Sequence, residues 1–260
     1  MGKVYEKTRD LADFLKQHRK LFPEIVRVVK EGGSICWQVG NHVDENEVAP
    51  LDYYVFRIAQ EHPELKLRNR IVWTFGHGLH CRQRFSGRHE TILWFTKGDK
   101  YHFDLDPVRV KQKYPGKLGY KGKNKGKPTS NPLGKNPSDV WDIPNVKGQH
   151  PEKTKHPCQF PIALAQRLVL ALTNKNSVVL DPFVGSGSAG IAALVEGRKF
   201  VGAELKQSYH KLASKRLLDA LNGSIRFRSH NRPIHVPGPN EKVAQDPFVI
   251  PFPNGQEKAS

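Results

Sequence analysis

Cysteine is scarce in this sequence: only Cys36, Cys81 and Cys158 occur among 260 residues. Their odd number and wide spacing argue against a disulfide framework and indicate a reducing compartment. Acidic residues are also few, since 25 Asp and Glu stand against 42 Lys and Arg, for a formal net charge of +17. This imbalance predicts a polyanionic partner, of which nucleic acid is the commonest.

Long apolar runs are absent as well. No stretch is long enough to cross a bilayer, and the charged N-terminus lacks the apolar core of a secretory signal. We therefore expect a soluble, cytoplasmic protein that does not associate with a membrane. The hydrophobic content of 37% suits a globular core. The length fits one large domain or two small ones.

Hydrophobic periodicity predicts regular elements in two parts of the chain. In the first part we expect helices over 11–29 and 51–60, and strands over 34–39, 70–75 and 91–96. In the second part we expect helices over 160–172, 188–196 and 207–221, and strands over 178–180 and 199–203. Alternating strands and helices predict a parallel sheet with helices on its faces. The tail after Gly223, rich in Pro, Asn and charge, is expected to be loosely ordered.

The segment 107–138 contains no Asp or Glu, many Lys, and repeated Gly, Pro and Asn. Such a composition cannot build a core, so we expect a long functional loop. Lysines can neutralise phosphates, and Tyr114 and Tyr120 can stack on bases. The alternative is a disordered basic linker. The candidate phosphate-binding residues here are Arg109, Lys111, Lys113, Lys117, Lys121, Lys123 and Lys125.

A second loop, between the strands 70–75 and 91–96, is rich in Gly, His and Arg. Its His77, His80 and Cys81 could suggest a metal site, but no second ligand pair follows at a suitable spacing, so we expect no metal. A surface facing nucleic acid is the preferred interpretation, with Arg82, Arg84 and Arg88 as its candidate contacts. The strand residues Trp37, Trp73 and Trp94 are expected in the core or in a pocket wall.

The strongest motif is Asp181-Pro182-Phe183-Val184-Gly185-Ser186-Gly187-Ser188, which joins a predicted strand directly to a predicted helix. In an α/β sheet this arrangement places a ligand at the carboxyl end of the strand. Gly185 and Gly187 permit a sharp turn, and the helix N-terminus offers unpaired N–H groups. Glu204 ends the next strand, where an acid can accept hydrogen bonds from both hydroxyls of a ribose. A tight turn that binds no ligand would explain the Gly-x-Gly pattern alone. It would not explain the full succession of strand, Asp-Pro-Phe, Gly-Ser-Gly, helix, strand and acid.

This segment resembles the cofactor motif of the N6-adenine/N4-cytosine DNA methyltransferase family, which reads Asp-Pro-Phe-x-Gly-Ser-Gly. The segment 156–161, His-Pro-Cys-Gln-Phe-Pro, resembles the family's second cofactor-pocket motif. The similarity extends to about residue 221, in the order of the subgroup whose catalytic half precedes its cofactor half. By this resemblance the residues that bind S-adenosylmethionine are Asp181, Phe183, Gly185, Ser186, Gly187 and Glu204, with His156, Cys158, Gln159 and Phe160 closing the site.

The resemblance implies an α/β, Rossmann-like S-adenosylmethionine-dependent methyltransferase fold, with a mostly parallel sheet and an inserted basic target-recognition loop. It implies a domain over 1–222, with the insert at about 105–150 and the cofactor half at 156–222, and a loosely ordered tail over 223–260. The implied reaction is methyl transfer to the exocyclic N6 of adenine in double-stranded DNA, with cytosine N4 as the alternative. Because the amine itself attacks, no cysteine should be a nucleophile, and Cys→Ser changes should leave activity intact. Implied partners are DNA and a cognate restriction endonuclease in a restriction–modification system, with the protein a monomer or homodimer.

The family's catalytic motif, Asp/Asn/Ser-Pro-Pro-aromatic, is missing, because the 260 residues contain no Pro-Pro dipeptide. The segment 246–248, Asp-Pro-Phe, lacks the second proline. In relatives, sequence like that of residues 2–6 follows the motif within a few residues, so we expect the motif upstream of Met1. The encoding DNA upstream of Met1 should then contain it in frame. The catalytic residues are therefore unassigned, and an inactive DNA-binding remnant is a further alternative. A nucleotide-dependent oxidoreductase is disfavoured, because the turn lacks a third glycine.

Overall fold

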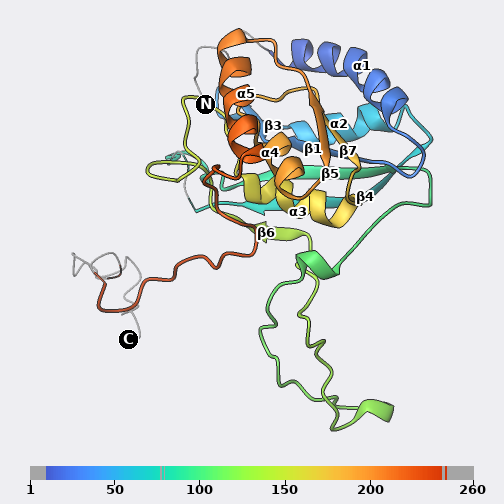
Figure 1. Ribbon diagram of the computed structural model, residues 1–260, viewed down its shortest axis with the longest axis vertical. Helices are drawn as coiled ribbons and strands as arrows, with labels where there is room; N and C mark the ends of the chain where they lie inside the picture. Colours follow the sequence, from blue (N-terminus) through green and yellow to red (C-terminus); the bar gives the residue numbers. More distant parts are fainter. Residues whose placement is uncertain (1–9, 77, 79, 242–243, 245–260) are drawn as a thin grey trace.

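The computed structural model describes residues 10–76, 78, 80–241 and 244. At its centre lies a four-stranded sheet in the order β1-β5-β4-β6 (Figure 1). Its strands are β1 (Ser34–Val39), β4 (Leu65–Thr74), β5 (His89–Lys97) and β6 (Val140–Asp142). The segments 2–6 and 246–248, which bear on the position of the catalytic motif, lie outside the described residues.

The central sheet is mixed. Strand β5 runs antiparallel to both of its neighbours, β1 and β4, whereas β6 runs parallel to β4. The expectation of a mostly parallel sheet is therefore wrong for this sheet. The physical reason is that the loop 75–88 joins β4 directly to β5 and turns the chain back on itself, so that the two strands pair antiparallel. Only β6, which arrives after the long insertion, joins in the parallel direction.

A second, two-stranded sheet consists of β7 (Val178–Asp181) and β8 (Lys199–Gly202), which pair in parallel. The helix α4 (Ser188–Val195) connects them, and α5 (Gln207–Leu221) follows. This strand–helix–strand–helix run confirms the prediction to within one residue at each boundary. Among the described strands β7 pairs only with β8, and Val178, Leu180 and Val201 are exposed on the face opposite Val179, which packs into the core.

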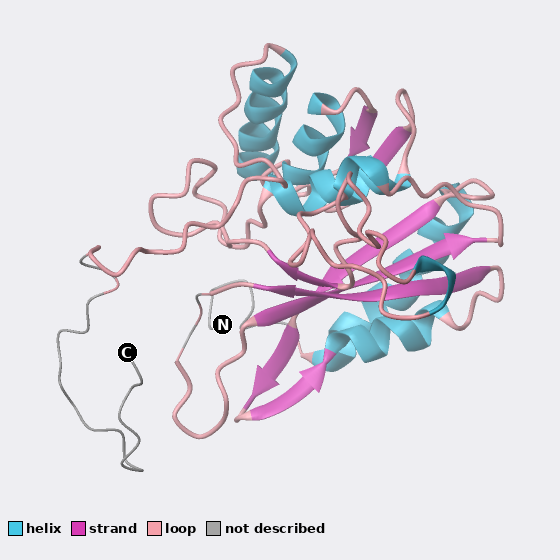
Figure 2. Cartoon of the chain, turned by 90° about the horizontal axis from the view of Figure 1, so that it is seen from below, coloured by secondary structure: helices cyan, strands magenta, loops and turns pink. Residues whose placement is uncertain are grey.

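Helices cover both faces of the central sheet (Figure 2). The helices α1 (Leu11–Val28) and α2 (Leu51–Ala59) pack on one face, where Phe22 of α1 meets Phe95 of β5. The helix α3 (Ile162–Leu172) packs on the other, where Leu164 meets Trp73 of β4. Successive side chains of a strand point to opposite faces, so β1, β4 and β5 contribute to both clusters, whereas β6 contributes only Trp141, to the cluster under α3. No helix in the described part of the chain is long and apolar enough to traverse a bilayer.

A short hairpin, not predicted from the sequence, follows β1. Its strands β2 (Asn41–Asp44) and β3 (Glu47–Pro50) pair antiparallel. The two residues at its turn, Glu45 and Asn46, have φ of 43° and 70°. Two-residue hairpin turns of type I′ require this left-handed conformation at both residues.

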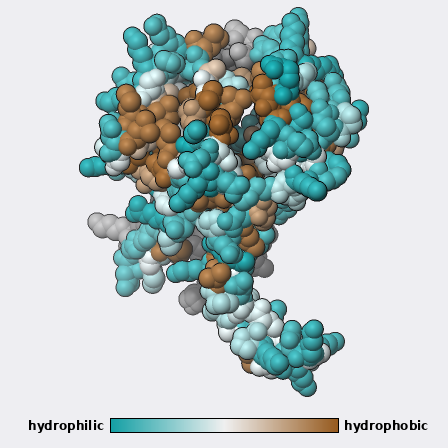
Figure 3. Space-filling model, turned by 45° about the vertical axis from the view of Figure 1, so that its right-hand side comes forward, coloured by the Kyte–Doolittle hydropathy of each residue, from teal (hydrophilic) through white to brown (hydrophobic). Residues whose placement is uncertain are grey.

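The basic segment between β5 and β6 forms a projecting arm. We define the basic arm as residues 109–135, preceded by the 3-10 turn η1 (Asp106–Val108) and containing η2 (Gly122–Asn124). Val110 and Lys135 form an antiparallel bridge at its base, and Leu118 and Pro128 form a second one further out. The arm extends away from the body and carries a mostly hydrophilic surface (Figures 1 and 3). The long loop expected here is thus a narrow arm held by a few backbone contacts.

The chain after α5 corrects another expectation, that of a loosely ordered tail from residue 223. Ile225 and Phe227 pack against the cluster around α3 and α4. The N–H of Arg228 donates to the buried carboxylate of Glu152 at 3.1 Å, and the N–H of His230 donates to Gln166 at 2.9 Å. Two apolar side chains and two buried acceptors therefore fix residues 225–230 to the body.

Candidate functional site

The carboxyl ends of several strands meet at one edge of the molecule. Because β1, β4 and β6 run in the same direction, the loops that follow them, 40–50, 75–88 and 143–161, leave from this carboxyl edge. The ring of Phe183, just after β7, contacts Trp37 of β1 edge to face, with ring centroids 6.0 Å apart. This contact brings the end of β7 to the same edge. Ligands of α/β proteins bind in this position.

The segment 181–188 forms a tightly bonded turn between β7 and α4. The carboxylate of Asp181 accepts the N–H of Phe183 at 2.9 Å, and the N–H of Gly187 donates to the carbonyl of Val184 at 2.8 Å. Gly187 caps α4 with φ of 83°, a conformation that side chains with a Cβ disfavour. The hydroxyl of Ser188 donates to the carbonyl of Phe160 at 2.8 Å. The two sequence motifs therefore lie side by side.

Glu204 is fixed beside this turn. Its carboxylate accepts the N–H of Gly185 and the N–H of Lys206, each at 2.8 Å. Burial raises the pKa of the Asp181 carboxyl, and the nearby charge of Glu204 raises it further. In the described part of the chain no ion pair neutralises either acid. The turn thus carries a concentration of negative charge in an otherwise basic protein.

His156 lies close against the turn. A Cβ added to Gly185, whose φ is +53°, would come within 3.0 Å of the Nε2 atom of His156. The His156 ring also contacts Tyr209 of α5, with ring centroids 4.5 Å apart. Glycine at position 185 is therefore required both by the backbone conformation and by the approach of the imidazole.

The other residues of the second motif act differently. The side-chain oxygen of Gln159 accepts from the N–H and the hydroxyl of Thr154, and its amide group donates to the carbonyl of Glu152 at 2.7 Å. Cys158 is exposed, and the ring of Phe160 packs between two core clusters. Gln159 and Phe160 therefore shape the loop that carries His156. The hydrogen bonds of Gln159 also occupy polar atoms that a ligand could otherwise bind.

One residue at the site was missed by the sequence reasoning. The guanidinium of Arg216, buried on α5, donates to the carbonyl of Ser186 inside the turn. Burial lowers the pKa of Arg216, although the charges of Glu152 and Asp219 oppose this effect. An arginine within a helix rich in basic residues gives no sequence signal of burial. Ser186 itself is buried, so its carbonyl holds α5 against the turn.

The predicted nucleic-acid contacts fall into two separate groups. Arg82, Arg84 and Arg88 lie on the loop 75–88 at the carboxyl edge. The basic arm follows β5, which runs antiparallel to β1 and therefore ends at the edge of the sheet opposite the carboxyl edge, beside the start of β1. Before it reaches the arm, the chain passes the C-terminal end of α3, where the N–H of Asp104 donates to the carbonyl of Ala171. The arm residues predicted as contacts are Arg109, Lys111, Lys113, Lys117, Lys121, Lys123 and Lys125. The structure does not bring these two groups together.

The three strand tryptophans lie in the core. Trp37, Trp73 and Trp94 are buried, as predicted, and Trp37 adds a pocket wall through its contact with Phe183. Of the residues that suggested a metal, His77 lies outside the described residues. Over the described ranges no group of three or more His, Cys, Asp or Glu side chains is placed to hold a metal ion.

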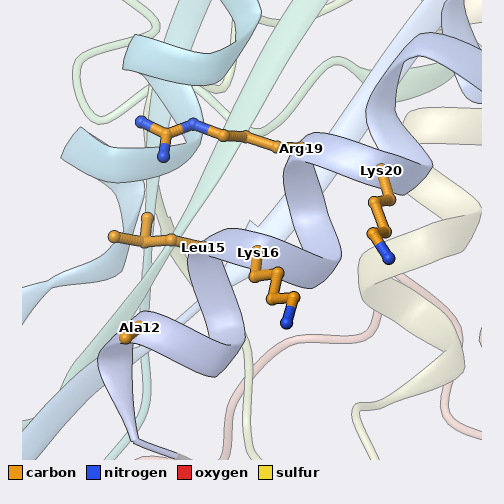
Figure 4. A pocket seen from close by; sticks show the side chains of 5 residues that line it. All are labelled: Ala12, Leu15, Lys16, Arg19 and Lys20. Atoms are coloured by element: carbon orange, nitrogen blue, oxygen red, sulfur yellow. The ribbon is translucent and has the colours of Figure 1, made fainter.

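A hollow elsewhere on the surface does not belong to this site. It is lined by five residues of α1, which Figure 4 labels: Ala12, Leu15, Lys16, Arg19 and Lys20. Side chains from a single helix provide no convergent polar groups of the kind that orient a ligand. The carboxyl edge remains the candidate site.

Comparison with known proteins decides the family. Residues 1–215 match the family described as DNA methylase, whose members act on N6 or N4. The chain belongs to this family of S-adenosylmethionine-dependent DNA methyltransferases. The family resemblance and the α/β methyltransferase fold expected from the sequence are thereby confirmed.

Individual DNA methyltransferases show how far the similarity extends. The type II methyltransferase M.BglII of Bacillus subtilis is 46% identical over 214 residues, which cover 82% of this chain and 59% of the relative. The DNA adenine methyltransferase YhdJ of Escherichia coli (strain K12) is 35% identical over 153 residues, 58% of this chain and 52% of the relative. The solved PvuII DNA methyltransferase (cytosine-N4-specific) has the same fold, with a TM-score of 0.64, 17% identity, and coverage of 88% of this chain and 82% of that one. The chain thus spans little more than half the length of these two sequence relatives.

Proposed function

We propose that this chain is the cofactor-binding and DNA-reading part of a site-specific DNA methyltransferase that modifies the N6 amine of adenine in double-stranded DNA. The observation that carries the proposal is the arrangement of Asp181 and Glu204 around the Gly185 turn, at the carboxyl edge and at the start of α4. Family membership supplies the reaction class.

The residues at this site suit S-adenosylmethionine in charge, in hydrogen-bond acceptors and in apolar surface. Glu204 has two carboxylate oxygens held in place by backbone N–H groups, an arrangement suited to accepting hydrogen bonds from ribose hydroxyls. Asp181 adds negative charge suited to an amino group, and the exposed ring of Phe183 offers an apolar face to a base. When bound, this cofactor supplies a methyl group on a positively charged sulfur. Under this proposal Gly185 and Gly187 let it approach the backbone, while His156 and Cys158 close the site.

The choice of adenine N6 rests on the sequence relatives. The Escherichia coli relative at 35% identity is named as an adenine methyltransferase. The cytosine-N4-specific PvuII enzyme is similar at only 17% identity, which supports the fold and not the base. Cytosine N4 is the alternative, and a DNA-binding remnant without activity is the further one.

DNA as substrate is supported by the charge of +17 and by two groups of basic residues. Arg82, Arg84 and Arg88 lie at the edge where the cofactor would bind, so we propose that they contact DNA near the target base. The basic arm would contact phosphates further away. The type II names of the relatives favour a restriction–modification setting with a cognate endonuclease.

Two measurements test the proposal together. Titration calorimetry should show S-adenosylmethionine binding to the wild-type chain, and binding should fall at least about tenfold, or about 1.4 kcal/mol, in Glu204→Gln. DNA incubated with the chain and cofactor is then digested and analysed by mass spectrometry. N6-methyladenine supports the main proposal, and N4-methylcytosine supports the alternative. Cofactor binding with neither base supports the remnant, and no cofactor binding contradicts the proposal.

A further inference from the structure

The loop 75–88 presents one aromatic side chain entirely to solvent. Phe85 has an exposed fraction of 99%, whereas Phe22 of α1 and Phe95 of β5 are buried. A phenyl ring gains free energy when it leaves water, so a fully exposed one gives up stabilisation that the fold could have used. Exposure of this kind is typical of a side chain that is buried against a partner.

The loop holds Phe85 in a defined position. The N–H of Phe75 donates to the carbonyl of Arg88 at 3.0 Å across the base of the loop, and the N–H of Cys81 donates to the hydroxyl of Ser86 at 3.0 Å within it. The side chain of Gln83 accepts from Asn46, at the turn of the β2–β3 hairpin, at 2.8 Å. Two neighbouring elements of the carboxyl edge are therefore joined by a side-chain hydrogen bond close to Phe85 in the sequence.

The charges around Phe85 identify the partner. Arg82, Arg84 and Arg88 flank the ring in the sequence, and Arg84 donates to the carbonyl of Phe85 itself at 3.4 Å. An aromatic ring among arginines suits a partner with an anionic backbone and an apolar stack of flat rings, which is the chemistry of duplex DNA. Apolar side chains inserted between base steps unstack and kink a duplex.

We propose that Phe85 is a wedge that inserts into the base stack of duplex DNA while the neighbouring arginines contact phosphates. The proposal rests on DNA being the substrate of the proposed function, and it adds how the target base leaves the stack. An enzyme that acts on a base amine must extrude that base, which costs unstacking energy. A ring that fills the vacated space offsets part of this cost.

A single substitution can detect insertion of the side chain at position 85 into DNA, and the recognition sequence need not be known. The four native tryptophans, Trp37, Trp73, Trp94 and Trp141, are all buried. In Phe85→Trp the introduced indole is therefore the most accessible one. Its emission should fall at least about twofold on binding mixed-sequence genomic DNA fragments, because stacked bases quench indole, and should change little with heparin, a polyanion without bases. Equal responses to the two polyanions, or unchanged emission on DNA that is shown to be bound, would overturn the proposal.

Removal of the ring gives the second readout. Phe85→Ala should weaken binding to the same fragments by about tenfold. Tyr53→Ala, which removes a half-exposed aromatic ring on α2, is the matched control and should leave binding unchanged. Unchanged DNA binding in Phe85→Ala contradicts the wedge. Cofactor binding, measured separately by calorimetry, shows whether the proposed function fails together with the wedge. If the wild-type chain binds no DNA, both the wedge and the proposed function fail.

Discussion

Glu204 accepts the backbone N–H of Gly185 at 2.8 Å, and this hydrogen bond joins the end of β8 to the turn after β7. Two residues 19 positions apart in the sequence thereby form one side of the candidate cofactor site. The same carboxylate accepts the N–H of Lys206. A cofactor whose ribose replaced one of these bonds would bind to an acid already held in place, which reduces the entropy lost on binding.

The Gly185 turn gives the sharpest test of the site. Gly185→Ala and Gly197→Ala both place a Cβ at a positive φ, +53° and +74°, which should cost about 1 to 2 kcal/mol of folding stability each. Gly197 follows α4, and a Cβ there meets no atom within 4 Å, whereas one at Gly185 meets His156. Thermal unfolding should show a loss for both variants, and the larger loss for Gly185→Ala, because its Cβ also approaches His156. Calorimetry should show weakened S-adenosylmethionine binding only for Gly185→Ala, and equal binding by both variants would remove the turn from the site.

The Asp181 carboxyl predicts a pH-dependent stability effect. Burial, and then the charge of Glu204, raise its pKa, so the folded chain binds the proton more tightly than the unfolded chain. The ionised group therefore destabilises the fold fully above its folded pKa. This penalty shrinks as the pH falls from the folded pKa toward the unfolded value of about 3.9, and it is absent below that value. Asp181→Asn keeps an oxygen for the N–H of Phe183 and should raise the melting temperature near pH 7.5.

This gain should shrink steadily toward pH 4 in thermal scans. Cofactor affinity of Asp181→Asn should fall at the same time, since the negative charge is lost. Stability that is lower than wild type at pH 7.5 would show that the carboxylate has a favourable partner and is not penalised by burial.

The three cysteines should differ in reactivity toward iodoacetamide at pH 8. Burial raises the pKa of Cys36 to about 12, so its thiol stays protonated and should be alkylated last. Cys158 is exposed and lies in the loop next to the turn, so S-adenosylmethionine should slow its alkylation. Cys81 is the control, because the loop 75–88 belongs to neither cofactor motif, and the cofactor should slow its alkylation less than that of Cys158. Mass spectrometry of tryptic peptides measures all three rates, and equal slowing of Cys81 and Cys158 would contradict local protection.

Part of the fold was predictable because its signals are local. The bounds of α5 and of β1 match the predicted ranges, since apolar spacing marks both elements. The placement of β5 between β1 and β4 depends on pairing between distant segments. The alternation of apolar and polar residues within one strand does not specify which strands lie beside it in the sheet. The β2–β3 hairpin was missed because its strands are short and polar and its turn residues, Glu45 and Asn46, are not a strong hairpin signal.

The candidate site was predictable to a similar degree. The motif 181–188 and Glu204 identified the turn, because glycine and acid positions there follow from strand–helix geometry. The separation of the basic arm from Arg82, Arg84 and Arg88 could not be predicted, since it depends on the direction of β5. The roles of Gln159 and Arg216 depend on hydrogen bonds to atoms far away in the sequence.

The basic arm should supply salt-dependent affinity. Removing one lysine that neutralises a phosphate should reduce the slope of log K against log salt concentration by about 0.9. Changing Lys121, Lys123 and Lys125 to alanine together should therefore lower this slope measurably in fluorescence anisotropy with duplex DNA. Changing Lys16 and Lys20 on α1 to alanine removes charge from the body and is the control. Equal slopes in the arm variant and the wild type would show that the arm does not bind phosphates.

The edge of β7 that faces away from β8 affects how the protein should be handled. Among the described strands nothing pairs with that edge, and Val178, Leu180 and Val201 expose an apolar face beside it. An open strand edge next to apolar surface is a template for pairing between molecules. We expect concentrated samples of this chain to scatter light increasingly on storage, and dilution or an added cosolvent to slow that loss of material.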